Sequence, residues 1–177
     1  VAAPVAGAVD TSVEANSSDN DIALDLSGGE ATSVDVDIQP DHGTATADGT
    51  SITYTPDAGY SGPDSFTYTA TNDTGTSDPA TVTITVNAPT LGFEPIDGPL
   101  DDGTVDESYS VTITAEDGAE PYTYEVTSGD LPDGLELNAN TGEISGTPTE
   151  DGEFSFTITA TDKYSATGEA SYSITIT

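Results

Sequence analysis

Apolar and polar residues alternate along much of this chain, with the period of two that is expected of half-buried β-strands. In the longest example, residues 154–161, every second residue is apolar: Phe154, Phe156, Ile158 and Ala160. The residues between them are Ser and Thr, which favour the solvent-facing side of a strand. No apolar repeat of helical period extends over a useful length. The pattern therefore predicts an all-β protein.

The same alternation recurs at short intervals through the whole sequence. It predicts strands at residues 22–26, 34–38, 44–47, 51–55, 65–71, 81–86, 109–113, 122–126, 135–137 and 172–176, after a first edge strand near residues 1–7. Residues that tolerate positive φ lie between these segments, as at Asp48-Gly49 and Asn140-Thr141-Gly142. Many short strands separated by such turns favour antiparallel β-sandwiches.

The second half, from about Pro89 to Thr177, carries three spaced motifs. They are Leu-Pro-Asp-Gly-Leu at 131–135, Asn-Thr-Gly-Glu-Ile-Ser-Gly-Thr-Pro at 140–148 and Gly-Glu-Phe-Ser-Phe-Thr-Ile-Thr-Ala-Thr-Asp at 152–162. Together they closely resemble the putative Ig domain of bacterial and archaeal surface proteins, a relative of the dystroglycan-type cadherin-like domain. The resemblance implies a β-sandwich that serves as a building block of secreted proteins, and it implies no reaction.

The first half, from about Val1 to Asn87, has motifs of its own. They are Gln-Pro-Asp-His-Gly-Thr at 39–44, Ser-Ile-Thr-Tyr-Thr-Pro at 51–56, Gly-Tyr-Ser-Gly at 59–62 and Asp-Ser-Phe-Thr-Tyr at 64–68. They resemble the bacterial cadherin-like tandem-repeat domain of giant adhesins. Many members of that family have an Asp-rich loop where residues 26–31 contain only one acid, Glu30, so the resemblance implies a degenerate calcium loop. Asp19-Asn20-Asp21 has a spacing compatible with a cadherin-type site, or it forms a plain turn before a strand.

A boundary is predicted at Asn87-Ala88-Pro89, where one alternating pattern ends and another begins. We therefore expect two tandem immunoglobulin/cadherin-like Greek-key sandwiches, at residues 1–88 and 89–177. The connection is too short for a flexible tether, so end-to-end stacking with limited hinge freedom is expected. We interpret the chain, which begins with Val1, as a piece of a longer protein.

The charge balance is extreme, because 33 acidic residues face a single Lys and no Arg, for a formal net charge of −32. Nothing in the chain can neutralise phosphates, which excludes nucleic acids and anionic membranes as partners. Calcium or a high-salt environment would relieve the self-repulsion, which fits a halophilic source; simple solubility of a secreted protein is the alternative explanation. The absence of Cys excludes disulfides, thiol catalysis and zinc–thiolate sites. No apolar run reaches the length of a membrane span.

Catalysis has few candidate residues in this sequence. The single His, His42, lies in a Pro-Asp-His-Gly turn that fits the hairpin pattern of the first-half family, which indicates a structural role rather than a catalytic triad. Pairs of acids are uninformative where acids are so many, and there is no Trp to stack on a sugar. The single Lys, Lys163, follows Asp162 in a loop, whereas an isopeptide bond needs a buried Lys. We expect a protein without enzymatic activity.

The resemblance of the second half also implies a candidate calcium site. Calcium-binding members of that family use an acidic turn after the second strand and the Asp that ends the Thr-Ala-Thr-Asp strand. Those positions are Glu116, Asp117 and Asp162 here, and Glu120 and Glu107 are further candidate ligands. Residues 118–122 instead resemble the Gly-x-Pro-Tyr variant of the turn, which generally lacks the metal. A solvated acidic loop is the competing interpretation.

These observations favour a non-catalytic spacer module of a large secreted or cell-surface adhesin, in which stacked modules extend a distal functional domain. The alternative is a carbohydrate-binding or accessory module of an extracellular hydrolase. The expected partners are neighbouring Ig-like modules of the same chain and a cell-surface or glycan ligand. Nucleic acid binding and membrane insertion are not expected, and a monomer is.

Overall fold

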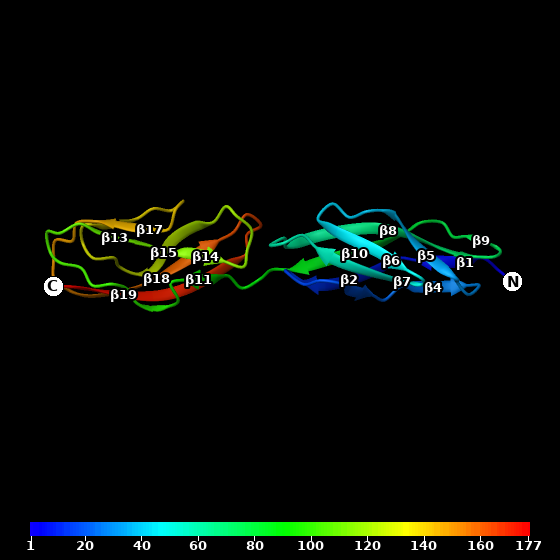
Figure 1. Cartoon of the computed structure of the whole chain (residues 1–177), viewed down its shortest axis with the longest axis horizontal. Helices are drawn as coiled ribbons and strands as arrows, with labels where there is room; N and C mark the ends of the chain where they lie inside the picture. Colours follow the sequence, from blue (N-terminus) through cyan, green and yellow to red (C-terminus); the bar gives the residue numbers. More distant parts are fainter. The chain divides into compact units, whose positions relative to one another are not determined.

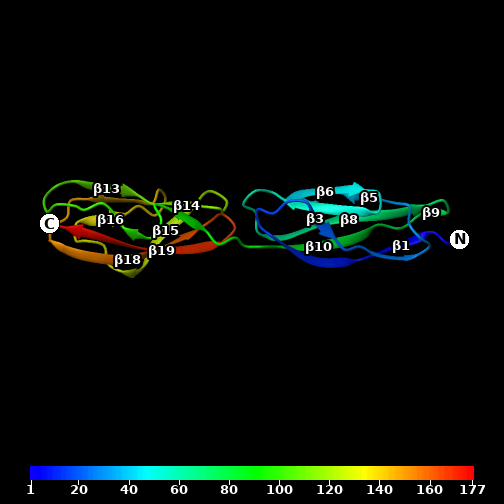
Figure 2. The same ribbon diagram turned by 60° about the horizontal axis from the view of Figure 1, so that its bottom comes forward.

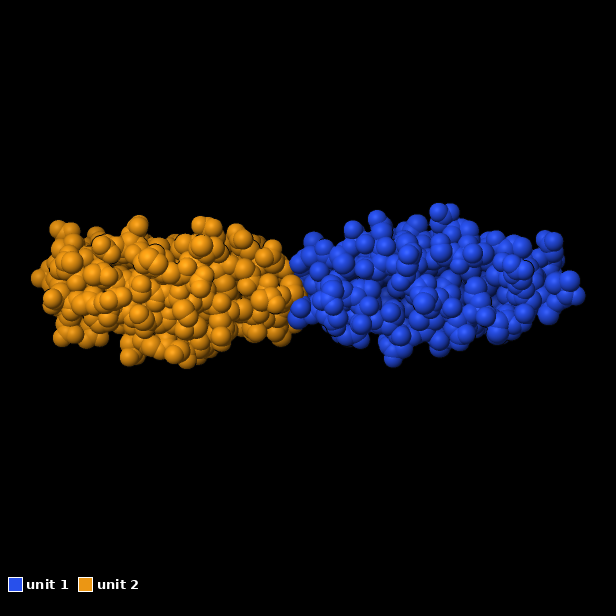
Figure 3. Space-filling view, turned by 90° about the horizontal axis from the view of Figure 1, so that it is seen from below, with its two compact units in different colours: residues 1–88 blue, residues 89–177 orange.

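The computed structural model describes residues 1–177 and consists of strands, turns and loops without a helix. The prediction of an all-β fold is confirmed. The chain divides into two compact units, which we call unit 1 (Val1–Ala88) and unit 2 (Pro89–Thr177) (Figure 3). No helix in the structure is long and apolar enough to span a membrane.

Unit 1 contains ten strands (Figure 1). They are β1 (Pro4–Gly7), β2 (Val9–Glu14), β3 (Asn20–Ile22), β4 (Asp25–Gly28), β5 (Ser33–Ile38), β6 (Gly43–Asp48), β7 (Ser51–Pro56), β8 (Gly62–Asn72), β9 (Gly75–Thr76) and β10 (Ala80–Asn87). The largest sheet has the order β2-β10-β8-β5, with β9 on β8, while β3-β7-β6 and β1-β4 form the other sheets. The pairing of β2 with β10 is parallel, and the other pairings in the unit are antiparallel.

The core of unit 1 follows the predicted faces of its long strands. Alternate residues of β8 and β10 are buried between the sheets: Phe66, Tyr68, Ala70, Val82, Ile84 and Val86. One expected core residue, Ile38, is instead 62% exposed. A register shift between Val36 and Ile38 in the pairing of β5 with β8 explains the difference, because a bulge interrupts the alternation of faces.

The single strand expected at 22–26 is two strands in the structure. β3 ends at Ile22 and pairs with β7, whereas β4 begins at Asp25 and pairs with β1. The first strand also continues past the expected residues 1–7, since β2 follows after a break at Ala8 and pairs with a different sheet from β1. Alternation alone does not reveal where the chain leaves one sheet and joins another.

Unit 2 contains nine strands, which are seen from a second direction in Figure 2. They are β11 (Gly92–Glu94), β12 (Gly98–Pro99), β13 (Tyr109–Thr112), β14 (Thr114–Glu116), β15 (Thr123–Gly129), β16 (Leu135–Leu137), β17 (Glu143–Gly146), β18 (Gly152–Thr161) and β19 (Thr167–Ile176). One sheet has the order β12-β19-β18-β15, a second β13-β17-β16, and β11 pairs with β14. As in unit 1, an early strand joins the last one in parallel, here β12 with β19.

The core of unit 2 is built on the predicted stretch 131–162. Leu135, Ile144, Phe156 and Ile158 are all buried in one cluster, while Phe154 at the end of the sheet is half-buried. The turn before β17 depends on Gly142, which has a φ of +74°. A Cβ there would overlap the carbonyl oxygen of Ile113, so the position needs glycine for space as well as for conformation.

Tyrosine hydroxyls at the edges of both cores bond to backbone carbonyl oxygens of neighbouring segments. Tyr68 donates to the carbonyl oxygen of Gly7 at 2.8 Å, Tyr109 to that of Asp101 at 2.8 Å and Tyr172 to that of Pro95 at 2.7 Å. Burial raises the pKa of Tyr172 to about 12, helped by nearby carboxylates. No buried side-chain nitrogen or oxygen lacks a hydrogen-bond partner.

Candidate functional site

Of the residues predicted to bind calcium, Glu116, Asp117 and Asp162 lie at one end of unit 2, whereas Glu107 does not. Asp162 directly follows β18 and lies beside the start of β19, because its backbone N–H donates to the carbonyl oxygen of Ala166. Glu107 lies in the loop before β13, four residues after Gly103, which bridges to Ile176 at the far end of β19. The ten residues of β19 span roughly 30 Å at the usual rise of an extended strand. Glu107 and Asp162 are therefore at opposite ends of the sandwich.

Asp162 is only 6% exposed, and its carboxylate accepts hydrogen bonds from backbone amides. Its Oδ1 accepts hydrogen bonds from the N–H groups of Tyr164 and Ala166, both at 2.8 Å. Its Oδ2 accepts from the N–H of Ala119 at 3.1 Å. A Cβ on Gly118 would lie 2.7 Å from Oδ2, so this turn approaches the carboxylate as only glycine allows. Asp162 thus joins its own loop to the turn at 116–122.

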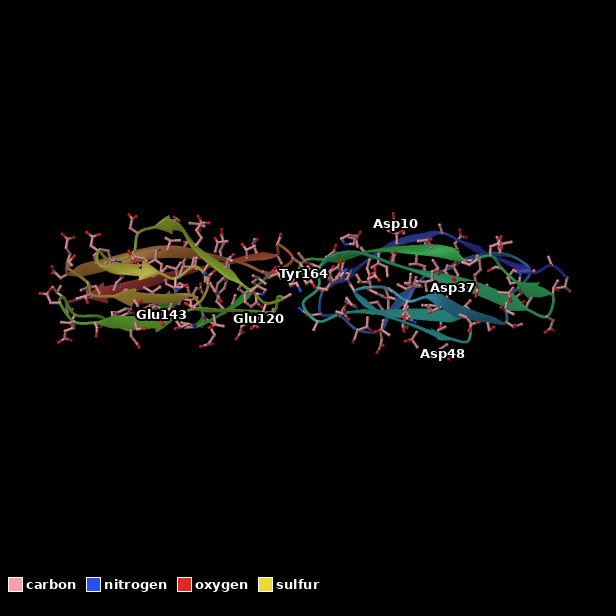
Figure 4. All side chains as sticks on the ribbon, turned by 90° about the horizontal axis from the view of Figure 1, so that it is seen from above. Asp10, Asp37, Asp48, Glu120, Glu143 and Tyr164 are labelled. Carbon is pink, nitrogen blue, oxygen red and sulfur yellow. The ribbon has the colours of Figure 1, made fainter.

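The predicted set of residues does not fit a calcium ion. Calcium takes six to eight oxygens from converging loops, whereas no group of three or more His, Cys, Asp or Glu residues in the structure is arranged to hold a metal. Glu116 and Asp117 are exposed beside the turn, and Asp117 has a φ of +72°. Figure 4 shows Glu120 and Tyr164 at this same end of unit 2. The oxygens of Asp162 face N–H donors, which repel a cation.

Asp19-Asn20-Asp21 in unit 1 forms a turn followed by the start of β3. The N–H of Asp19 donates to the Thr55 hydroxyl at 2.9 Å. The side-chain amide of Asn20 donates to the carbonyl oxygen of Tyr54 at 3.0 Å and to the Ser17 hydroxyl at 2.9 Å. The contacts with Thr55 and Tyr54 attach the turn to β7, and no group of three or more acidic residues is gathered there to hold a metal.

His42 is part of a packed polar cluster with Tyr60, Tyr54 and Asp64. Its ring stacks on Tyr60 with centroids 4.1 Å apart and planes 6° from parallel. The nearby buried carboxylate, Asp64, accepts from the backbone N–H of His42 at 3.3 Å and from the hydroxyl of Tyr54 at 2.6 Å. Burial raises the pKa of Tyr54, and the hydrogen bond and charge of Asp64 raise it further.

The sequence interpretation missed the pair formed by Tyr54 and Asp64. A signal for it was present, because Asp64 precedes Phe66, Tyr68 and Ala70 at the same inward-facing positions of β8. An acidic residue in phase with buried apolar residues predicts a carboxylate that is turned toward the core and must be hydrogen-bonded there.

A shallow groove of about 360 Å³ crosses the outer face of the sheet β12-β19-β18-β15. None of its lining residues is charged: Gly98, Pro99, Ser128, Gly129, Ser155, Phe156, Thr157, Ser171, Tyr172 and Ser173. The hydroxyls of Thr157 and Ser171 are 3.0 Å apart in its floor. Strand register places Glu153 beyond one side of the groove and Glu125 and Glu169 beyond the other. The groove is thus a neutral, hydroxyl-rich area on an acidic protein.

The fold and the two family matches are those of a tandem pair of Ig-like β-sandwich modules, as predicted. Residues 2–85 match the model of the family described as Bacterial Ig domain. Residues 97–177 match the model of the family described as Putative Ig domain. No curated protein sequence matches the chain.

Several solved structures are similar over nearly the whole chain. An endo-fucoidan hydrolase of glycoside hydrolase family 107 is 22% identical over 98% of this chain and 28% of its own, with a TM-score of 0.41. Extracellular cadherin domains 3–6 of protocadherin gamma B2 are 15% identical over 99% of this chain and 52% of theirs, with a TM-score of 0.44. Drosophila N-cadherin EC1-3 is 13% identical over 96% of this chain and 64% of its own, with a TM-score of 0.40. The chain spans less than two thirds of each of these proteins.

Proposed function

We propose that the two units are non-catalytic spacer modules of a larger secreted or cell-surface protein, such as an adhesin, in which they extend a distal functional domain. The path of the chain within each unit supports this proposal. In unit 1, Ala2 is hydrogen-bonded to Asn72 at the end of β8, and β2 runs parallel to β10, which is antiparallel to β8, so the chain enters at one end and leaves at the other. Modules of this kind can be joined head to tail without a return connection.

Unit 2 has the same property. Leu91, near its start, packs against Gly168 at the beginning of β19, and the chain leaves after Ile176 at the end of that strand. Each unit therefore extends the chain by roughly 30 Å or more. The distribution of acids supports the same role, because labelled acids such as Asp10, Asp37 and Asp48 lie on the outside of unit 1 (Figure 4). Such a surface keeps a long extracellular protein dispersed and repels anionic partners.

Small-angle scattering tests the proposal directly. A compact globule of 177 residues has a radius of gyration of about 16 Å. The spacer function requires the two units to stack end to end, and two units of about 35 Å in that arrangement would give a rod of about 70 Å with a radius of gyration of roughly 22 Å. A value near 22 Å at 0.15 M NaCl, with a monomer mass, is the expected result. A value near 16 Å would contradict the spacer function.

A second candidate function is recognition of an uncharged glycan, and the neutral groove of unit 2 favours it. Its volume is within the range of small-ligand sites, and its hydroxyls can both donate to and accept from sugar hydroxyls. Titration of isotope-labelled protein with cellohexaose and mannohexaose is expected to shift the amide signals of Ser128, Thr157 and Ser171. The variant Thr157→Val should lose these shifts, whereas Thr83→Val on the outer face of unit 1 should keep them. Unchanged spectra at 10 mM of either sugar would remove this candidate.

A further inference from the structure

The long central strands of the two units end in related sequences. Thr-Ala-Thr precedes Asn72 at the end of β8 and precedes Asp162 directly after β18. Both side chains are buried, at 8% and 6% exposure, although each begins a surface loop that leads to the last strand of its unit. We call Asn72 and Asp162 the closing residues.

One oxygen of each closing residue orders the loop that follows it. Oδ1 of Asn72 accepts from the N–H groups of Thr74 at 2.8 Å and Gly75 at 3.3 Å. Oδ1 of Asp162 accepts from the N–H groups two and four residues later, at 2.8 Å each. In both units, the side chain therefore replaces backbone partners for amides that turn away from the strand.

The second polar atom of each closing residue bonds to a different segment of the chain. Nδ2 of Asn72 donates to the carbonyl oxygens of Ala2 at 2.8 Å and Glu30 at 3.2 Å. Oδ2 of Asp162 accepts from the N–H of Ala119 at 3.1 Å. In unit 1 the neighbouring segments present carbonyl oxygens, which match the NH₂ donor of Asn72. In unit 2 the neighbouring segment presents an N–H group, which matches the carboxylate acceptor of Asp162.

We propose that the closing residues hold the loops at one end of each unit together by hydrogen bonds alone, and that Asp162 does so in place of a calcium ion. A carboxylate has about four lone-pair sites, and three N–H groups occupy three of those of Asp162. A calcium ion held by both oxygens would have to displace at least one of these donors and leave an amide without its partner, which is unfavourable. The residue that the family resemblance assigned to calcium thus joins the same loops without a metal.

Exchanging the two residue types tests the match of hydrogen-bond polarity. Asp162→Asn must direct its NH₂ group either at the N–H of Ala119 or at the two N–H groups of its own loop, so donors face donors in both orientations. Asn72→Asp places carboxylate oxygen against the carbonyl oxygens of Ala2 and Glu30. We expect each change to lower the melting temperature of its own unit by about 5–15 °C. In Asp162→Asn, hydrogen exchange should accelerate at least tenfold at the amides that face the new NH₂ group, which are either that of Ala119 or those of Tyr164 and Ala166.

Two matched controls remove the effect of charge from this comparison. Asp10→Asn deletes an exposed carboxylate, and Asn140→Asp adds one in an exposed turn, so each reproduces the charge change of one test variant. Both controls are expected to shift the melting temperature by less than about 2 °C. If Asp162→Asn and Asn72→Asp shift the melting temperature as little as these controls do, the proposed role of the closing residues is refuted.

Calcium dependence is measured on the unmodified protein, so this part of the test does not require a variant to fold. Melting curves in 0.15 M NaCl with 1 mM CaCl₂, 1 mM MgCl₂ or 1 mM EDTA are expected to agree within about 1 °C. Amide spectra should show no calcium-specific shift at Ala119, Tyr164 or Ala166. A calcium-specific rise of several degrees that saturates at micromolar free ion, together with shifts at these amides, would overturn the proposal.

Discussion

The hydroxyl of Tyr54 should be one of the most sensitive atoms in unit 1. Tyr54 has no exposed surface, and its hydroxyl donates to Oδ2 of Asp64 at 2.6 Å. Tyr54→Phe removes this donor and leaves a buried carboxylate with only backbone donors, from His42 at 3.3 Å and Ser65 at 2.9 Å. A hydrogen bond to a charged group contributes about 1.5–3 kcal/mol. The variant should therefore lose about 2 kcal/mol of unfolding free energy, or roughly 8–16 °C in the melting temperature of a unit of this size.

The same contact predicts how stability depends on pH. Burial and Asp64 raise the pKa of Tyr54 in the folded state, so the folded protein holds this proton more tightly than the unfolded chain does. The stabilisation is fully present below the unfolded value of about 10 and is lost as the pH rises beyond it. Between the unfolded and the folded pKa, each such tyrosine lowers the free energy of unfolding by about 1.4 kcal/mol per pH unit. Tyr54→Phe should therefore reduce the slope of stability against pH above 10 by about this amount.

Urea unfolding at pH 8, 10.5 and 11.5 measures both effects, with amide spectra assigning each transition to its unit. Tyr164→Phe serves as the control, because Tyr164 lies in a loop of unit 2. The expected result is a loss confined to unit 1 at pH 8 and a shallower alkaline slope than in the unmodified protein. A loss below 0.5 kcal/mol at pH 8, or an unchanged slope, would refute the reasoning.

Three further predictions concern charge, an edge strand and a turn. A net charge of −32 over 9252 Å² of accessible surface corresponds to about one charge per 290 Å², or a spacing of about 17 Å. Melting temperatures should therefore rise between 0.01 and 0.2 M NaCl, because the Debye length falls from about 30 to about 7 Å. A flat profile would contradict this. The side-chain amide of Gln39 bonds both the N–H and the carbonyl oxygen of Ala45 on the edge strand β6, at 3.0 and 2.9 Å. Gln39→Ala should destabilise unit 1 by about 1–2 kcal/mol and promote self-association in sedimentation experiments, whereas an unchanged monomer would count against this edge protection. Gly142→Ala should lower the unfolding free energy of unit 2 by more than about 2 kcal/mol in urea unfolding, because a positive φ and an overlap with Ile113 act together. Gly49 has a φ of +60° but open space around it, so Gly49→Ala should lower that of unit 1 by only about 1 kcal/mol. Equal losses would disprove the steric argument.

Alternation along the sequence was sufficient to predict the fold class and the inward faces of the longest strands. Phe156, Ile158 and Ala160 in β18 and Phe66 and Tyr68 in β8 are buried as expected. These predictions succeed because an extended strand turns successive side chains to opposite faces whatever its neighbours are. Turn residues succeed for a similar local reason, as Gly142 illustrates with its positive φ.

Pairing between distant segments was decided only in three dimensions. The exposure of Ile38 follows from a bulge against β8, and the parallel pairing of β2 with β10 joins residues about 70 positions apart. The positions of the candidate calcium residues were likewise decided by the tertiary structure. Asp162 lies at the start of β19 and bonds to Ala119. Glu107 lies near the other end of β19, because Gly103 bridges to Ile176, so Asp162 and Glu107 are far apart. Local chemistry therefore determines which residues form strands and turns, whereas the path of the backbone between the sheets determines which carboxylates meet amides.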